Sequence, residues 1–476
     1  MRAGRRVLVF LLLPLILLAS CAPALARPEP VPTPDPGQGG EIIPFPEKSI
    51  FEKAWIWFRN LPWWLQLILL IVVVAAAIVA LYLWWTSGEE DGETPDCVVM
   101  IDAIMFNHDT TKMSSDAMNI RKDHDETIEP PEWMLGETWI PEDCRAAYSI
   151  ADVGSVVTIK ARFAVYPTDV TSATVWATGG GLLGPIQPQV INFVNGISDP
   201  EFVEIPLSGH TIKTGGVRKE DLSWTWQYTC GHEEVGRTMT TTYHRVYVVV
   251  KEPQGPWEQQ LYPANIQNPW ADVLEYSCEW ARGTTTVDNA ATMITRKVNE
   301  PAGNVKYDQA SGASYYTRGD WFLCTAYIAQ LRGEGWSDIV NCTDCASFVT
   351  TFANILGCEL WESRMRRNFG IYPIIGIGLT DFGPPFTNPD RWGFSYHEVA
   401  WKAPAGNADR LFDACLKVNA REDGQTGRPD RQNPTAELPT YAVFSDASFC
   451  YKKKLVQEAH RPNCNPTQRG WRRRVA

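Results

Sequence analysis

The sequence has no excess of basic residues and no long-range repeat. Its 43 lysines and arginines face 55 aspartates and glutamates, which gives a formal net charge of −12 at pH 7. A protein that binds nucleic acid needs a basic face to neutralise phosphates, so this balance argues against a nucleic-acid partner. No collagen-like, coiled-coil or solenoid period is present, which excludes those architectures.

What is present is enough apolar material for two or three domains. Apolar residues make up 45% of the 476 residues and charged residues 21%, so the chain can bury a core and is not disordered as a whole. Twelve cysteines are many for a cytosolic enzyme and favour an oxidising compartment.

Residues 1–26 have the layout of a secretory signal. Arginines within the first six residues precede a short apolar run at 7–18, and a cluster of small residues follows. Leu18-Ala19-Ser20-Cys21 also resembles the bacterial lipobox, in which the cysteine is lipidated and becomes the new N-terminus. Cleavage after Ala26, with Cys21 discarded, is the alternative, and the sequence leaves both open.

A transmembrane helix is predicted at 61–85, between a proline-rich linker at 27–60 and an acidic linker at 86–96. The segment is 25 residues long, Gln66 is its only polar side chain, and tryptophans lie at its two ends. At ~1.5 Å per residue it can cross a hydrocarbon core of ~30 Å. We therefore expect the protein at the cell membrane, with the membrane as one of its partners.

Two signals disagree on the side of the membrane that the rest of the chain occupies. A signal segment followed by one span returns the C-terminal part to the cytoplasm. Lys53 and Arg59 precede the span, whereas only acidic charges follow it at 86–96, and this distribution places the C-terminal part outside. The cysteine content favours the extracytoplasmic placement, and a cytoplasmic one stays open.

Residues 97–252 are expected to form an immunoglobulin-like β-sandwich. Runs rich in Val, Ile, Thr and aromatic residues alternate with Gly, Pro, Asn and Asp clusters, and about seven strands at these spacings are typical of that fold. Trp224, Trp226 and Tyr228 alternate along one run, so one of its faces is buried. No titratable groups gather here, which favours a spacer or a binding module. The expected strands are 98–106, 155–165, 172–178, 190–194, 202–206, 222–228 and 240–250.

The C-terminal region, 253–476, carries the residues that indicate chemistry. From Asn341 to Gly357 apolar residues recur at three- and four-residue spacing, which predicts a helix that begins with a capping box of Asn341 and Asp344. Cys345 is expected to point into the core. Cys342 lies in the first turn, where unpaired N–H groups and the helix dipole favour a thiolate.

His397 and Asp413 are predicted to be neighbours on the two strands of a hairpin. The stretch 402–410 contains a turn cluster, and Ala405, taken as the midpoint of that cluster, is eight residues from each. Residues equidistant from a turn face each other across antiparallel strands, so the carboxylate should contact the imidazole and leave the second ring nitrogen free for a thiol. A one-residue bulge would spoil this arrangement.

These residues resemble the transglutaminase-like superfamily of papain-like cysteine enzymes. The likeness consists of Cys342-x-Asp344-x-Ala346 at a helix start, then His397 followed by an apolar strand, then Asp413. It implies an α+β transglutaminase-like domain in which Cys342 is the nucleophile. His397 would be the general base and then the acid, and Asp413 the orienting carboxylate.

The likeness extends over about 261–450 and includes one departure. Ala414 and Cys415 follow the aspartate, where members of the family usually have a proline. The resemblance also implies an oxyanion hole made by the nucleophile's own N–H and an upstream group. Trp336 and Trp321 are the nearby tryptophans, and the sequence does not choose between them.

The implied chemistry is acyl transfer at a protein or peptide amide, without a cofactor or metal. The sulfur attacks the carbonyl, backbone N–H groups at the helix start hold the oxyanion, and His397 protonates the departing amine. Water then gives hydrolysis, and an amine such as lysine gives a cross-link. The alternative is a non-catalytic envelope scaffold or binding protein. The predicted fold class is multidomain: a transmembrane helix, an immunoglobulin-like sandwich and a transglutaminase-like domain.

The cysteines and the basic tail also permit other interpretations. Cys342-x-x-Cys345 has no second Cys-x-x-Cys or His-x-His pair to complete a zinc site, and a redox motif would want a strand directly before it. With Cys21 and Cys342 set aside, ten cysteines remain, so five disulfides are possible and their connectivity is not readable. The basic tail at 469–474 is expected to be a solvated terminus.

Overall fold

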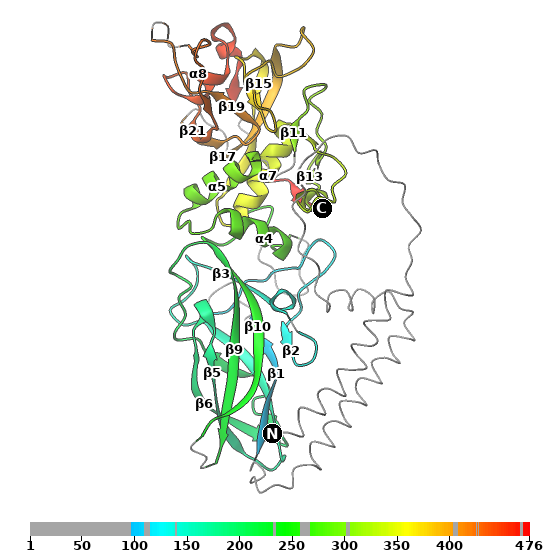
Figure 1. The fold of residues 1–476 in the computed structure, drawn as a ribbon, viewed down its shortest axis with the longest axis vertical. Coiled ribbons are helices and arrows are strands. Elements are labelled where there is room, and N and C mark those ends of the chain that lie inside the picture. The colour runs from blue at the N-terminus through cyan, green and yellow to red at the C-terminus, as the bar shows by residue number, and fades with distance from the viewer. Residues whose placement is uncertain are drawn as a thin grey trace, which may run out of the picture. The chain divides into compact units, whose positions relative to one another are not determined.

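The computed structural model describes residues 97–476 except for short gaps. These gaps are 109–114, 139, 232–234, 258–266, 301–304, 403–407, 425, 427 and 467–469. The predicted signal, linkers and transmembrane segment, residues 1–96, lie outside the described residues. The described residues belong to one compact unit (Figure 1).

The structure corrects the predicted fold class and the predicted membrane localisation, both of which depended on a transmembrane helix. In the described part of the chain, no helix is long and apolar enough to cross a membrane. Strands predominate there, and its longest helices have 13 residues each, against the ~20 that a bilayer core requires.

The strands between residues 98 and 249 form one continuous ten-stranded sheet that encloses its own hydrophobic core. Its order is β2-β1-β4-β7-β6-β5-β9-β10-β3, with β8 beside β4. The strands are β1 (Val98–Met105), β2 (Trp133–Met134), β3 (Arg145–Ser149), β4 (Thr158–Tyr166), β5 (Ser172–Gly179), β6 (Ile186–Val194), β7 (Ile197–Ser198), β8 (Val203–Pro206), β9 (Arg218–Cys230) and β10 (Arg237–Val249).

Each of the seven predicted strands overlaps an observed strand, and Trp224, Trp226 and Tyr228 are buried as expected. The arrangement differs from the two separate sheets of the predicted immunoglobulin-like sandwich. Asn195 and Gly196, both at positive φ, form a tight turn after β6, and the β7 strand that follows pairs with β4. This hairpin joins the two halves of the sandwich into a single sheet, and residues 97–252 are called the sandwich below.

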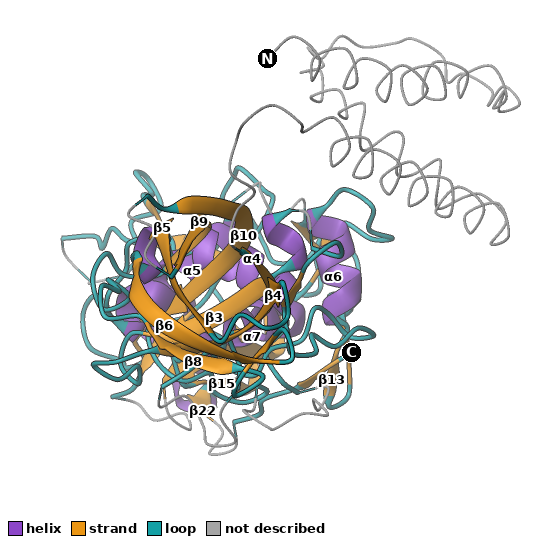
Figure 2. Cartoon of the chain, turned by 90° about the horizontal axis from the view of Figure 1, so that it is seen from below, coloured by secondary structure: helices purple, strands orange, loops and turns teal. Residues whose placement is uncertain are grey.

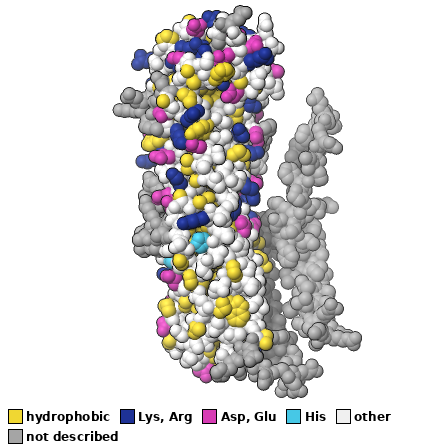
Figure 3. Space-filling model, turned by 90° about the vertical axis from the view of Figure 1, so that its left-hand side faces the viewer, with side chains coloured by type: hydrophobic (Ala, Val, Ile, Leu, Met, Phe, Trp, Pro, Cys, Tyr) yellow, Lys and Arg dark blue, Asp and Glu magenta, His cyan; other side chains and the backbone are white. Residues whose placement is uncertain are grey.

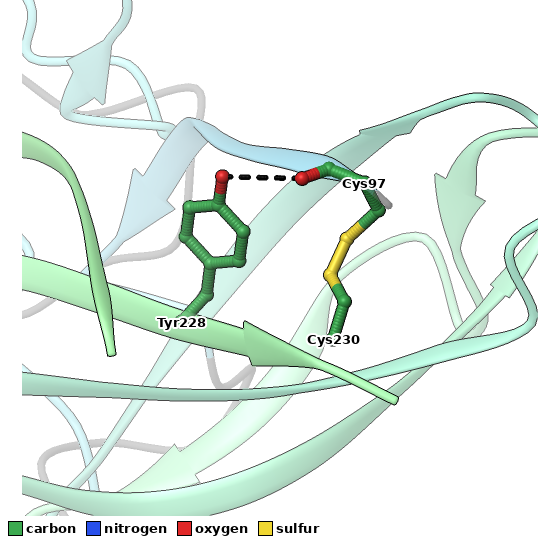
Figure 4. Close-up of a disulfide and its surroundings, with 3 residues drawn as sticks. All are labelled: Cys97, Tyr228 and Cys230. Carbon is green, nitrogen blue, oxygen red and sulfur yellow. Dashed lines mark hydrogen bonds between the residues drawn. A yellow bond between two sulfur atoms is a disulfide. The ribbon is translucent and has the colours of Figure 1, made fainter. Parts of the chain in front are cut away.

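One disulfide, Cys97–Cys230, ties the start of β1 to the end of β9, with the two Cα atoms 6.2 Å apart (Figure 4). The Tyr228 hydroxyl donates a hydrogen bond of 3.3 Å to the Cys97 carbonyl. The other nine cysteines of the described chain are free thiols. The possibility of five disulfides is therefore wrong for the described residues, which form one.

Among the described residues, five α-helices follow the sandwich: α4 (Ala271–Trp280), α5 (Val287–Asn299), α6 (Cys324–Leu331), α7 (Cys342–Asn354) and α8 (Tyr451–Leu455). In Figure 2 the purple helices α4 to α7 lie behind the orange strands of the sandwich. Helix α4 contacts β9 and β10 on one side and α5 and α7 on the other. Helix α7 is central, since all 13 of its residues are buried.

A second, five-stranded sheet with order β21-β18-β17-β15-β22 packs against α7. Its strands are β15 (Leu360–Gly370), β17 (Gly393–Lys402), β18 (Arg410–Phe412), β21 (Thr440–Val443) and β22 (Asn465–Pro466). The remaining short strands are β11 (Lys306–Tyr307), β12 (Thr317–Arg318), β13 (Trp321–Phe322), β14 (Ile339–Val340), β16 (Ile375–Gly376), β19 (Leu416–Asn419), β20 (Ala436–Glu437) and β23 (Arg474–Val475).

Candidate active site

Helix α7 begins at Cys342 and is capped by Asn341. Asn341 Oδ1 accepts hydrogen bonds from the N–H groups of Thr343 (2.9 Å) and Asp344 (3.1 Å). The Asp344 carboxylate in turn accepts from the Asn341 N–H (3.2 Å), which confirms the predicted capping box. The N–H of Cys342 is not one of the two donors that Asn341 Oδ1 accepts.

Asp344 also fixes the start of α7 to the loop before β12. Its buried carboxylate accepts from the Ser314 hydroxyl (2.6 Å) and from the N–H groups of Tyr315 and Tyr316 (2.9 Å each). Burial raises the pKa of Asp344, although these hydrogen bonds act in the opposite direction. Asp344 is a structural hydrogen-bonding residue, as expected from its position in the cap.

His397 in β17 and Asp413, directly after β18, are in contact. His397 Nε2 lies 2.8 Å from Asp413 Oδ2, and the two side chains are 0% and 1% exposed. The strands are antiparallel neighbours as predicted, but Ala400 pairs with Phe412, which shifts the register by two residues from the predicted direct pairing. Since side chains alternate with a period of two, this shift leaves both on the same face.

Three further donors hold Asp413 in place. Oδ1 accepts from the N–H groups of Cys415 (2.8 Å) and Leu416 (3.2 Å), and Oδ2 accepts from the Tyr451 hydroxyl (2.5 Å). Burial and the Asp413 charge raise the pKa of Tyr451 well above its ordinary value, so it keeps the proton that it donates. Sequence reasoning missed Tyr451, which lies 38 residues beyond Asp413 in a segment without a recognisable motif.

The pKa of the His397 imidazole is raised above its ordinary value, which favours the protonated ring. Burial lowers its pKa, but the Asp413 carboxylate, followed by the Cys342 sulfur, outweighs burial and raises the pKa of His397 to about 10. A carboxylate on one side of a buried ring thus reverses the direction in which burial alone would move the pKa.

Cys342 is a free thiol with 6% of its surface exposed. The Cys342 side chain raises the pKa of His397, which indicates that the two side chains are neighbours. Among the described residues, however, His397 Nδ1 has no hydrogen-bond partner of regular geometry. We regard the pair as close but not aligned, because proximity satisfies an electrostatic interaction whereas a hydrogen bond also needs a favourable angle. The three predicted site residues therefore come together from α7, β17 and the end of β18.

Cys345 lies in the core, as predicted, and it is near Cys415. Both are free and at most 1% exposed, and burial raises the pKa of each. The short strand β14 directly precedes α7, so one feature of a redox Cys-x-x-Cys is present. A redox motif does not require a histidine–aspartate contact such as that between His397 and Asp413, so this contact argues against the redox interpretation.

A second cysteine–histidine pair, which sequence reasoning missed, lies in the sandwich. Cys144 Sγ is 3.0 Å from His244 Nδ1, and His244 Nε2 is 2.7 Å from the Thr242 hydroxyl. Both members of the pair are 0% exposed. Burial lowers the pKa of His244 to about 3 and raises the pKa of Cys144 well above its ordinary value, so both are neutral.

The basic tail is part of the fold, which corrects its prediction as a solvated terminus. Strand β23 pairs in parallel with β13, and Trp471 exchanges two backbone hydrogen bonds with Glu362 in β15. The Arg473 side chain is 5% exposed and forms ion pairs with Glu362 and Glu398. The sequence did not indicate this, because the carboxylates that neutralise Arg473 are more than seventy residues away in the chain.

The two tryptophans considered for the oxyanion hole are both partly exposed, Trp336 at 56% and Trp321 at 40%. Trp336 contacts the rings of Tyr315 and Tyr316, whose N–H groups bind Asp344 in the first turn of α7. In the described residues, no cluster of three or more His, Cys, Asp or Glu side chains is arranged to hold a metal ion. Basic and acidic side chains are interspersed on the face drawn in Figure 3, and fewer charges cover its lower part.

Comparison with known proteins adds little beyond this geometry. The sequence matches no protein-family model and no curated protein. The fold has a weak structural similarity to the crystal structure of red sea bream transglutaminase, with a TM-score of 0.30 and 9% sequence identity. The match covers 60% of this chain and 50% of that one, so the chain spans half the length of that protein. The transglutaminase likeness is thus a weak similarity of structure, and a family is not shown.

Proposed function

We propose that this chain is a transglutaminase-like cysteine enzyme that transfers or hydrolyses the acyl group of a protein or peptide amide. Cys342 is the nucleophile, His397 the general acid and base, and Asp413 the orienting carboxylate. The observation that carries the proposal is the buried 2.8 Å contact between His397 and Asp413, which leaves the second ring nitrogen unpaired on the side of Cys342.

In the acylation step, the sulfur of Cys342 forms a bond to the substrate carbonyl carbon, and the carbonyl oxygen takes the negative charge. The Cys342 N–H, which lies outside the Asn341 cap, is a donor for that oxygen. The C–N bond then breaks as the His397 imidazolium passes its proton to the departing nitrogen. A thioester on Cys342 and a neutral His397 remain.

In the second step, water or an amine attacks the thioester carbon while neutral His397 takes its proton. The C–S bond breaks, the acyl group leaves as an acid or as a new amide, and the sulfur and the imidazolium return to their starting state. The raised pKa of His397 favours its role as the acid of the first step, because the ring carries a proton at neutral pH.

The alternative function is a non-catalytic scaffold, and the burial of the site favours it. His397 is fully buried and Cys342 is only 6% exposed, so little of the Cys342 side chain is accessible to a substrate carbonyl. An enzyme needs such access and a scaffold does not. The reactivity of Cys342 toward a small reagent separates the two functions.

The test is alkylation of the full chain with iodoacetamide, followed by mapping of the labelled cysteines by mass spectrometry. Cys450 is a half-buried free thiol in the same molecule and serves as the internal reference. We expect Cys342 to react faster than Cys450 at pH 7, and His397→Ala to remove that advantage. Faster reaction of the more exposed Cys450, or an unchanged rate in the His397 variant, would contradict the enzymatic function.

A further inference from the structure

Helix α7 contacts the second sheet through two hydroxyls that are one turn apart. Thr343 Oγ1 donates to Glu398 Oε2 in β17 (3.2 Å), and Ser347 Oγ donates to Glu362 Oε2 in β15 (3.0 Å). Positions i and i+4 lie on one side of a helix, so both hydroxyls face the sheet. Thr343 directly follows Cys342, and Glu398 directly follows His397. The first contact therefore joins the two elements that carry the reactive groups.

Two arginines hold the Glu398 carboxylate from its other sides. Arg364 Nε lies 2.6 Å from Oε2, and Arg473 Nη1 lies 2.6 Å from Oε1. Glu398 and Glu362 are both 0% exposed, and Arg473 bridges them from the C-terminal segment. Two buried carboxylates and two guanidinium groups balance in charge, which is the condition under which such groups are tolerated in a core.

We propose that Glu398 is a positioning residue of the candidate active site and that the C-terminal segment 470–476, through Arg473, holds it in place. Glu398 fixes Thr343, and Thr343 fixes the start of α7, so that Cys342 stays at a set distance from His397. This inference rests on the proposed function. Misplacement of a reacting group by ~1 Å costs roughly 10²-fold in rate, so a rigid link one residue from each partner has a kinetic consequence.

The competing explanation is an ion network that only stabilises the packing of α7. Such a network would affect unfolding and leave the reactivity of Cys342 unchanged. Removing one charged residue of this network would leave its partner buried without a counter-charge, which destabilises the fold. The test therefore changes the neutral member of the link, Thr343, whose hydroxyl also lies 3.3 Å from the Tyr396 hydroxyl.

The experiment compares Thr343→Val with Thr350→Val in the full chain. The two substitutions are the same, lie in the same helix and remove a buried hydroxyl, but Thr350 Oγ1 has no hydrogen-bond partner among the described residues. The readout is the rate of alkylation of Cys342 by iodoacetamide relative to Cys450, at pH 6 and pH 9. Thr343→Ser keeps the hydroxyl and serves as the rescue variant.

We expect Thr343→Val to slow the labelling of Cys342 about tenfold, the value of one hydrogen bond to a charged group. Thr343→Ser and Thr350→Val should keep the wild-type rate at both pH values. Equal rates in Thr343→Val and Thr350→Val overturn the positioning role. If His397→Ala also leaves the rate unchanged, the proposed function itself fails.

Discussion

The two buried cysteine–histidine pairs of this molecule differ in what lies behind the imidazole. In the sandwich, His244 is backed by the Thr242 hydroxyl at 2.7 Å, and burial lowers its pKa to about 3. In the C-terminal region, His397 is backed by the Asp413 carboxylate at 2.8 Å, and its pKa rises to about 10. Equal burial therefore gives opposite charge states, depending on whether the partner is neutral or anionic.

The sulfur partners differ in the same way. Cys144 follows a short 3-10 turn in the sandwich, is 0% exposed, and has a pKa raised by burial. Cys342 is the first residue of a 13-residue helix, where the dipole and unpaired N–H groups favour negative charge. A cysteine beside a histidine is thus no indication of chemistry by itself. The carboxylate and the helix start make the difference.

The largest effect is expected when each cysteine is removed. Cys342→Ala should abolish hydrolysis or transamidation of a peptide amide, because no nucleophile remains to form the thioester. Cys144→Ala should leave that activity unchanged, since its pair is neutral and closed to solvent. The activity of both variants is measured as the release of ammonia from a glutamine-containing peptide. Activity that survives in Cys342→Ala would show that another group performs the reaction.

Removal of the carboxylate should convert the second pair into a copy of the first. In Asp413→Asn, the pKa of His397 should fall below its ordinary value, because burial then acts without an opposing charge. Turnover should drop about 10²–10⁴-fold, the usual contribution of acid–base catalysis. Thr242→Val is the matched control beside His244 and should not affect turnover. If Asp413→Asn causes no further loss of turnover when it is added to a His397 variant, Asp413 acts through His397.

The pH dependence of stability should have opposite signs for the two histidines. The folded-state pKa of His397 is raised from 6.5 to about 10, so its stabilising contribution is complete below pH 6.5 and is lost as the pH rises through 10. The folded-state pKa of His244 is lowered from 6.5 to about 3, so its neutral form costs stability as the pH falls below 6.5.

Urea unfolding of wild type against His397→Gln and His244→Gln checks these signs. The wild-type advantage over His397→Gln should shrink from pH 7 to pH 10. The wild-type advantage over His244→Gln should shrink from pH 7 to pH 4. Differences that are independent of pH would mean that neither histidine has the charge state described above.

The smallest effect is expected at Tyr451, which supplies one of the four hydrogen bonds to Asp413. Tyr451→Phe removes a hydrogen bond to a charged group with a net value of ~1.5–3 kcal/mol, so turnover should fall by roughly 10- to 100-fold. Three donors remain to hold the carboxylate. A loss as large as that of Asp413→Asn would give Tyr451 a role in the reaction beyond positioning.

Local patterns predicted much of the fold, and pairings between distant residues escaped prediction. The strands of the sandwich and the capped helix α7 follow from periodicity and from Asn341 with Asp344, because these signals lie within a few residues. The hairpin of His397 was predicted with a register error of two, because the observed strand pairs are centred one residue beyond the predicted midpoint, Ala405. The segment predicted to be a transmembrane helix, 61–85, lies outside the described residues, and no helix among the described residues is long and apolar enough to cross a membrane.

The residues that were missed at the candidate site also depend on contacts between distant parts of the chain. Tyr451 and Arg473 reach the site from segments whose sequence indicates no chemistry, and only the folded chain brings their partners to them. The tail was expected to be solvated because its charges lack local counter-ions. Cys144 and His244 are 100 residues apart and come together because β3 and β10 are parallel neighbours.

Titration of the two histidines by NMR, with the Cε1–H resonances assigned by substitution, tests the central claim most directly. His397 should be an imidazolium at pH 7 and lose its proton near pH 10, and His244 should remain neutral at pH 5. A His397 ring that is neutral at pH 7 would contradict the assignment of a carboxylate-backed acid to this site.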